Sequence, residues 1–204
     1  MAYHLEQHPK MRAVVNFVPV LLDQLVDYSE QFLNHQLRDP LLRLLAHNNS
    51  GELSAEQRQL VLDACFRSEH TKMISPYPAY KRLLELFKLL QADGETALSY
   101  LSVQYMSDLL TWYHLAWCGE SVRREYALVA RLMSKAEGFS YEDRKQLLDL
   151  IGELIAGIIP RYRKLAESGQ IEISATPHYH PLAPLLIDFA SAKEAMPDAP
   201  LPNS

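Results

Sequence analysis

The sequence predicts an α/β protein in which two parallel strands are separated by a long helical segment. The first strand is expected near residues 12–18, where β-branched side chains cluster before Pro19. The second is expected near residues 170–175, where apolar and polar side chains alternate. Between them, from residue 37 to 168, the apolar side chains recur at helical spacing and no further strand is predicted.

Composition limits the class of protein and its partners. The chain has 204 residues, enough for one domain with a sizeable core. A formal net charge of −5 and the absence of any Lys/Arg run argue against nucleic acid as a partner. No apolar run approaches about 18 residues, so no membrane span is expected. Cys65 and Cys118 are far apart within helical patterns, which predicts reduced, buried thiols and a cytoplasmic location.

Residues 1–36 are expected to form the end of a helix, the first strand and a second helix. Pro9 stops the first helical pattern. The strand that follows has few polar positions, which is typical of a parallel strand covered on both faces. Residues 20–36 then show apolar side chains at helical spacing, with acidic and amide side chains between them.

Residues 37–168 are expected to form a helical insertion. A capping box at Ser54–Gln57 begins one helix, and the stretch Ser140–Asp143 caps the start of the last long helix. Residues 68–78, which contain two prolines, predict a loop. Pro160 predicts a kink or a break in the last helix. The predicted helices cover residues 40–46, 54–67, 80–92, 96–117, 121–136 and 141–168.

Residues 169–204 are expected to contain the second strand, an active-site loop and a following helix. Gly169 ends the long helix before the strand. The loop covers residues 176–184 and contains three prolines, the last of which suits the first turn of a helix. Loops beyond the carboxyl ends of parallel strands are where α/β proteins collect ligand-binding groups, so this loop is predicted to be functional.

Glu172 is the candidate site residue with the most specific setting, a carboxylate within an apolar strand just before the polar loop. The alternative is an ordinary solvent-facing glutamate. His178 and His180 could partner a buried carboxylate, and Pro181 favours an extended backbone at His180. The two histidines and Glu172 could also ligate zinc. Imidazoles in such loops more often bond substrate or backbone, so no metal is predicted.

Four stretches of the sequence resemble glycoside hydrolase family 57, which contains α-amylases, amylopullulanases, 4-α-glucanotransferases and branching enzymes. The most specific is the run from Gly169 to Ile173 followed by the run from Pro177 to Leu186, which is similar to the family's second signature region. The others occur in the family's order, so the resemblance covers nearly the whole chain. They are the stretches over residues 15–25, 108–119 and 195–202.

The resemblance implies an incomplete (β/α)7-type barrel with helical insertions, of which residues 1–204 form a single partial domain. It implies a retaining hydrolase or glucanotransferase that acts on α-glucans such as starch, glycogen and maltooligosaccharides. In the family, a glutamate and a histidine of the second signature region hold the sugar at the cleavage site. The matching residues in this chain are Glu172 and His180, and no cofactor is implied.

The family's other signatures are expected outside the chain, the first before residue 1 and the catalytic carboxylates after Ser204. No catalytic residue is therefore assigned, and the chain alone is expected to be inactive. A partial barrel exposes strand edges and apolar helix faces, which predicts self-association. Two alternatives are a catalytically inert helical module that binds carbohydrate or protein, and a small metalloprotein built on Glu172, His178 and His180.

Overall fold

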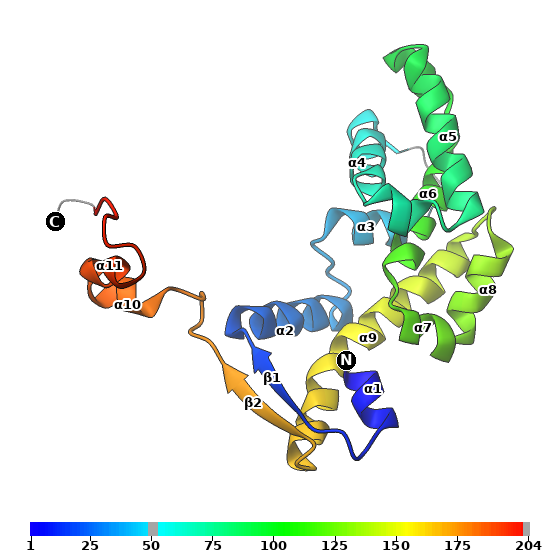
Figure 1. Cartoon of the computed structure of the whole chain (residues 1–204). Coiled ribbons are helices and arrows are strands. Elements are labelled where there is room, and N and C mark those ends of the chain that lie inside the picture. Colours follow the sequence, from blue (N-terminus) through cyan, green and yellow to red (C-terminus); the bar gives the residue numbers. More distant parts are fainter. Residues whose placement is uncertain (49–52, 202–204) are drawn as a thin grey trace. The chain divides into compact units, whose positions relative to one another are not determined.

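Two parallel strands and a series of helices make up the chain in the computed structural model, which describes residues 1–48 and 53–201 (Figure 1). The predicted α/β class, mostly helical with two parallel strands, is confirmed. The chain divides into a sheet unit, Met1–Glu30 with Ile155–Ser204, and a helical unit, Gln31–Leu154. Residues 202–204 of the predicted C-terminal segment lie outside the described residues.

The sheet unit contains both strands and the helices around them. Helices α2 and α9 contribute residues to both units. The elements are α1 (Ala2–Gln7), β1 (Ala13–Phe17), α2 (Pro19–Leu33), α9 (Tyr141–Glu167), β2 (Ile171–Ala175), α10 (Ala183–Ile187), the 3₁₀ turn η3 (Phe189–Ser191) and α11 (Ala192–Ala195).

Strands β1 and β2 pair in parallel along their whole length, from Ala13 opposite Ile171 to Phe17 opposite Ala175. Because side chains alternate along a strand, each strand presents one row to the helices and one row to the opposite side. The helix-covered row forms a small core, in which Val15 and Ile171 pack with Leu5 of α1 and Leu165 of α9.

The sequence-based expectation that β1 is covered on both faces is wrong. Val15 is buried, but its neighbour Val14, on the opposite face, is 66% exposed. Helices α1 and α9 pack against one face of the two strands, and no described residue buries the other. The open face is therefore available to a ligand or to further chain.

The junction between α9 and β2 is a Schellman turn followed by a buried amide. Gly169 adopts φ +68°, its N–H donates to the carbonyl of Ala166, and the N–H of Gln170 donates to the carbonyl of Leu165. The buried side chain of Gln170 then donates to the carbonyls of Leu5, at 2.5 Å, and His8, at 3.0 Å. One residue thus joins the end of α1, the end of α9 and the start of β2.

The helical unit is built from short helices around the buried helix α6. Its elements are α3 (Pro40–Ala46), α4 (Ala55–Phe66), the π-helical turn η1 (His70–Ile74), α5 (Pro78–Ala92), the 3₁₀ helix η2 (Glu95–Tyr100), α6 (Val103–Trp117), α7 (Glu120–Glu125) and α8 (Ala127–Lys135). The beginning of α9 completes it. The predicted capping box forms at Ser54 with Gln57, and the predicted cap at Ser140 forms through reciprocal bonds with Asp143.

Local side-chain bonds correct two of the predicted boundaries. The predicted loop over residues 68–78 contains the turn η1 because the Glu69 carboxylate accepts from the backbone N–H groups of Thr71 and Lys72. The predicted helix over residues 96–117 begins as 3₁₀ helix, and α6 proper starts after Ser102, whose hydroxyl accepts from the N–H of Tyr105 at 3.0 Å.

Two further helix predictions are corrected by the backbone itself. The helix predicted over residues 121–136 is divided at Tyr126, which has extended backbone angles (φ −103°, ψ 106°) and separates α7 from α8. At Pro160, where a kink or a break was predicted, the helix α9 continues to Glu167, so the break does not occur and the kink stays a prediction. Within the helical unit, the Asp108 carboxylate accepts from the N–H groups of Gly138 and Phe139 and so fixes the turn before α9.

Both cysteines are free thiols, as predicted. Cys65 is fully buried and Cys118 is partly buried. Burial raises the pKa of both thiols, which disfavours the nucleophilic thiolate. Neither cysteine is therefore a candidate for thiol catalysis.

Removal of the Gln170 amide is predicted to destabilise the chain. Gln170→Ala removes the side-chain donor to the buried carbonyl of Leu5, which then keeps its bond from the N–H of His8, and the loss of one such bond typically costs about 0.5–1.5 kcal/mol. Urea unfolding measures the change in the free energy of unfolding. Gln24→Ala, at an exposed position of α2, is the matched control and is expected to change that free energy by less than about 0.5 kcal/mol. Equal effects of the two substitutions would contradict the role of the amide.

His114 is predicted to make stability depend on pH. Its ring Nδ1 bonds the Leu110 carbonyl at 2.8 Å, and burial lowers the pKa of the imidazole. The unfolded chain therefore takes up a proton more readily than the folded chain once the pH falls below about 6.5, so stability falls with pH in that range. The urea concentration at the midpoint of unfolding should fall when the pH is lowered from 7.5 to 5.5. In His114→Asn, which lacks a titrating ring, this fall should be smaller than in the unaltered chain. His4→Asn, at an exposed position, is the control and should show the same fall as the unaltered chain. A fall of equal size in the His114 and His4 variants would refute the assignment to His114.

Candidate functional site

The open face of the sheet carries the candidate residue Glu172. Glu172 pairs with Val14 in the register of the sheet, and Asn16 pairs with Ser174 on the same face. The amide of Asn16 donates to the hydroxyl of Ser174 at 3.0 Å. This face therefore offers a carboxylate beside an amide–hydroxyl pair, a set of groups that can bond the hydroxyls of a ligand.

A shallow groove of about 430 Å³ lies along the amino ends of the two strands, and Glu172 lines it. The carboxylate is exposed, and among the described residues no hydrogen bond or ion pair links it to His178 or His180. Arg12, on the same groove, is held by its own backbone, since its guanidinium donates to the carbonyls of Pro9 and Met11. The predicted pairing of Glu172 with the loop histidines is therefore not formed.

The loop after β2 begins as a continuation of the sheet and then turns. The N–H of Thr176 donates to the carbonyl of Phe17 at 3.3 Å, and the N–H of His180 donates to the carbonyl of Pro177 at 2.8 Å. This turn places His180 at φ +55°. The expected extended backbone at His180 is therefore wrong, because closure of the turn outweighs the preference imposed by Pro181.

His178 points to a partner that the sequence did not suggest. Its ring Nε2 lies 2.6 Å from a carboxylate oxygen of Asp23 in α2. The two residues are 155 positions apart, and only the parallel pairing of β1 and β2 brings the start of α2 beside this loop. A sequence argument could have found Asp23 by placing the first turns of α2 at the carboxyl end of the sheet.

The alternative zinc site of Glu172, His178 and His180 is not formed. In the part of the chain that the structure describes, no three His, Cys, Asp or Glu side chains gather closely enough to hold a metal ion. The ring of His178 is instead engaged by Asp23. The metalloprotein hypothesis is therefore not supported.

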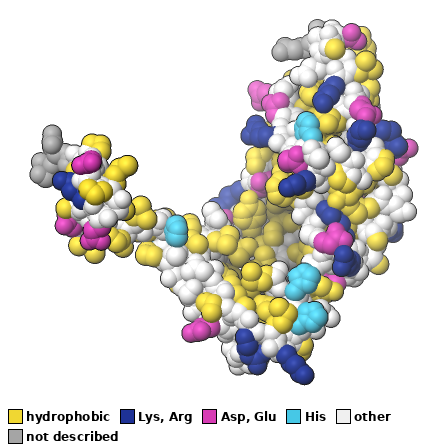
Figure 2. All heavy atoms as spheres, viewed as in Figure 1, with side chains coloured by type: hydrophobic (Ala, Val, Ile, Leu, Met, Phe, Trp, Pro, Cys, Tyr) yellow, Lys and Arg dark blue, Asp and Glu magenta, His cyan; other side chains and the backbone are white. Residues whose placement is uncertain are grey.

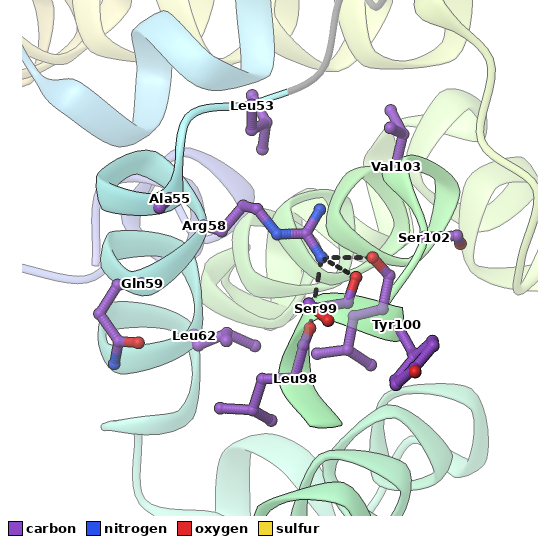
Figure 3. A pocket seen from close by; sticks show the side chains of 11 residues that line it. Leu53, Ala55, Arg58, Gln59, Leu62, Leu98, Ser99, Tyr100, Ser102 and Val103 are labelled. Atoms are coloured by element: carbon purple, nitrogen blue, oxygen red, sulfur yellow. Dashed lines mark hydrogen bonds between the residues drawn. The ribbon is translucent and has the colours of Figure 1, made fainter. Parts of the chain in front are cut away.

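The helical unit has a larger groove, of about 830 Å³, between α4 and the segment that leads into α6 (Figure 3). Its cationic side chain is Arg58, and one guanidinium nitrogen of Arg58 donates to the carbonyls of Leu98, Ser99 and Leu101. These bonds hold the 3₁₀ segment against α4, so Arg58 has a structural role. Among the described residues that line this groove there is no carboxylate or imidazole, so they offer no catalytic pair.

Comparisons with known proteins give one result. The model of the family described as glycosyl hydrolase family 57 matches residues 7–198. No match was found among curated proteins or solved structures. In the described residues, no helix combines the length and the hydrophobicity needed to cross a membrane. Because the family model matches all but a few residues at each end of the sequence, the chain belongs to glycosyl hydrolase family 57.

Proposed function

We propose that this chain is the sugar-holding part of an α-glucan hydrolase or glucanotransferase, and that Glu172 and His180 bind the sugar. The observation that carries the proposal is the position of Glu172 on the face of the sheet that none of the described helices covers. Family membership supplies the carbohydrate class of substrate. The choice of α-glucan rests on the resemblance of the stretch from Gly169 to Leu186 to the family's second signature region.

The uncovered face fits the interior of a barrel. In (β/α) barrels the helices pack on the outside of the strands, so the row of side chains opposite the helices points inward. Val15 and Ile171 form the helix-side row, and Glu172 and Ser174 belong to the inward row. The loop that carries His180 follows the carboxyl end of β2, where barrel enzymes build their sites.

The two residues suit recognition of a neutral polyol. A carboxylate accepts hydrogen bonds from two hydroxyl groups, and bonds to a charged acceptor are stronger than those between neutral groups. An imidazole adds a second donor or acceptor on the sugar. The role proposed for both residues is binding and orientation of the glucose unit.

The bond-breaking step needs two further carboxylates. A retaining mechanism uses a nucleophile and an acid/base group about 5–5.5 Å apart on either side of the glycosidic bond. We assign neither role to a residue of this chain, and we infer that residues 1–204 supply binding without turnover. The free thiols of Cys65 and Cys118 favour a cytoplasmic location for the protein.

Glu172→Gln is predicted to weaken the binding of maltoheptaose by about tenfold or more, because a hydrogen bond to a charged group contributes about 1.5–3 kcal/mol. Isothermal titration calorimetry on the full chain measures the affinity. Thermal unfolding should be unchanged, since the side chain of Glu172 is exposed and its carboxylate makes no hydrogen bond or ion pair within the described residues.

Glu167→Gln, an exposed carboxylate in the last turn of α9, is the matched control and should bind as the unaltered chain does. Equal affinity of the Glu172 and Glu167 variants would remove Glu172 from the site. Release of shorter sugars from maltoheptaose by the unaltered chain would show that a catalytic pair is present and would overturn the assignment of binding alone.

Self-association is also predicted. Each of the two strands has one unpaired edge within the described residues, and exposed hydrophobic side chains cover the segment from Leu182 to Met196 (Figure 2). Sedimentation velocity at micromolar concentration should show species larger than 23.3 kDa. A single monomeric species over a hundredfold range of concentration would contradict the prediction.

A further inference from the structure

The loop after β2 presents an exposed aromatic ring. Tyr179 is 80% exposed and stands between His178 and the candidate sugar-binding residue His180. The backbone on both sides is fixed, by the bond of Thr176 to Phe17 and by the turn from Pro177 to His180. The ring therefore stands near the carboxyl end of the sheet with most of its surface open to solvent.

The side chain of His178 constrains the orientation of this ring. The His178 imidazole and the Tyr179 ring are in contact edge to face, with centroids 4.4 Å apart and planes at 80°. The imidazole is itself fixed by Asp23, at 2.6 Å. Contacts thus run from α2 through His178 to Tyr179, and they link the orientation of the exposed ring to a helix of the scaffold.

The Asp23–His178 pair is suited to orienting a side chain of the loop and contributes little to the stability of the fold. The side chains of Asp23 and His178 are 69% and 44% exposed, and a pair this exposed contributes little to the stability of a fold. Such a pair hardly affects the stability of the fold. It is enough to favour one orientation of a loop side chain several-fold over others.

We propose that Tyr179 is a stacking surface for a glucose unit of the substrate and that Asp23 and His178 position it. The proposal rests on the proposed function, because it takes the ligand to be an α-glucan. A pyranose ring has an apolar face of C–H groups that packs on an aromatic ring, while its hydroxyls point to the sides. Tyr179 would cover that face while His180, the next residue, reaches the hydroxyls.

Binding of maltoheptaose to the full chain tests the stacking role. Tyr179→Ala should weaken the affinity by about tenfold, and Tyr179→Phe should retain most of it, because the ring and not the hydroxyl makes the contact. Tyr100→Ala is the matched control, since Tyr100 is 82% exposed and belongs to the helical unit. Equal affinity of Tyr179→Ala and the unaltered chain would overturn the proposal.

A double-mutant cycle tests the positioning role. Asp23→Ala should weaken the affinity about threefold in the unaltered chain and should have no effect in the Tyr179→Ala background, because it acts through that ring. Glu30→Gln, an exposed acidic position in the same helix, should change neither. An equal loss from Asp23→Ala in both backgrounds would refute the positioning role.

The two proposals can fail separately. If the unaltered chain binds maltoheptaose and Glu172→Gln weakens it while Tyr179→Ala does not, the proposed function stands and this inference is wrong. If the unaltered chain does not bind maltoheptaose at all, the proposed function fails and the inference fails with it.

Discussion

The turn at Gly169 and Gln170 is the constraint on which the sheet and its site depend. Gly169 takes the left-handed conformation that ends α9, and the backbone of Gln170 closes the turn. The Gln170 side chain then enters the interior and bonds the carbonyl groups at the end of α1. Because a buried amide without partners is costly, this residue favours the arrangement of α1, α9 and β2 in which both bonds form. The start of the second strand is therefore fixed.

A fixed start decides which face of the sheet carries the carboxylate. Side chains alternate along β2, so a shift by one residue would turn Glu172 toward the helices and expose Ile171. The core of Leu5, Val15 and Leu165 opposes that shift, since each buried aliphatic side chain contributes about 1.5–3 kcal/mol. An ionised carboxylate placed among these side chains would add a further penalty. The same interactions that stabilise the sheet therefore direct Glu172 to the open face.

Local patterns predicted the strands and the capped helices because their causes lie within a few residues. The alternation in β2 and the box at Ser54 are of this kind. The turn η1 and the division of the helix at Tyr126 were not predicted. A carboxylate cap causes the first and a single residue with extended backbone causes the second, and neither changes the spacing of apolar side chains in the sequence. At the site, the sequence pattern of the strand was enough to select Glu172 as a candidate. The sequence could not show that, within the described residues, Glu172 makes no hydrogen bond or ion pair with the histidines of the loop. The bond between Asp23 and His178 spans 155 residues, so no local pattern contains it.

The candidate site thus combines a part that a buried core holds and a part that weaker bonds at the surface hold. Glu172 stands on a strand that a buried core and a buried amide hold, whereas the loop beyond β2 is fixed by backbone bonds and one exposed pair. Ligand-binding segments are commonly drawn from the less stable parts of a structure. A site for a long, flexible sugar chain benefits from this division, because the carboxylate sets the register while the loop adapts at low cost. The pair of Asp23 and His178 limits the loop to a few orientations. Less free energy is therefore needed to order the loop when the sugar binds.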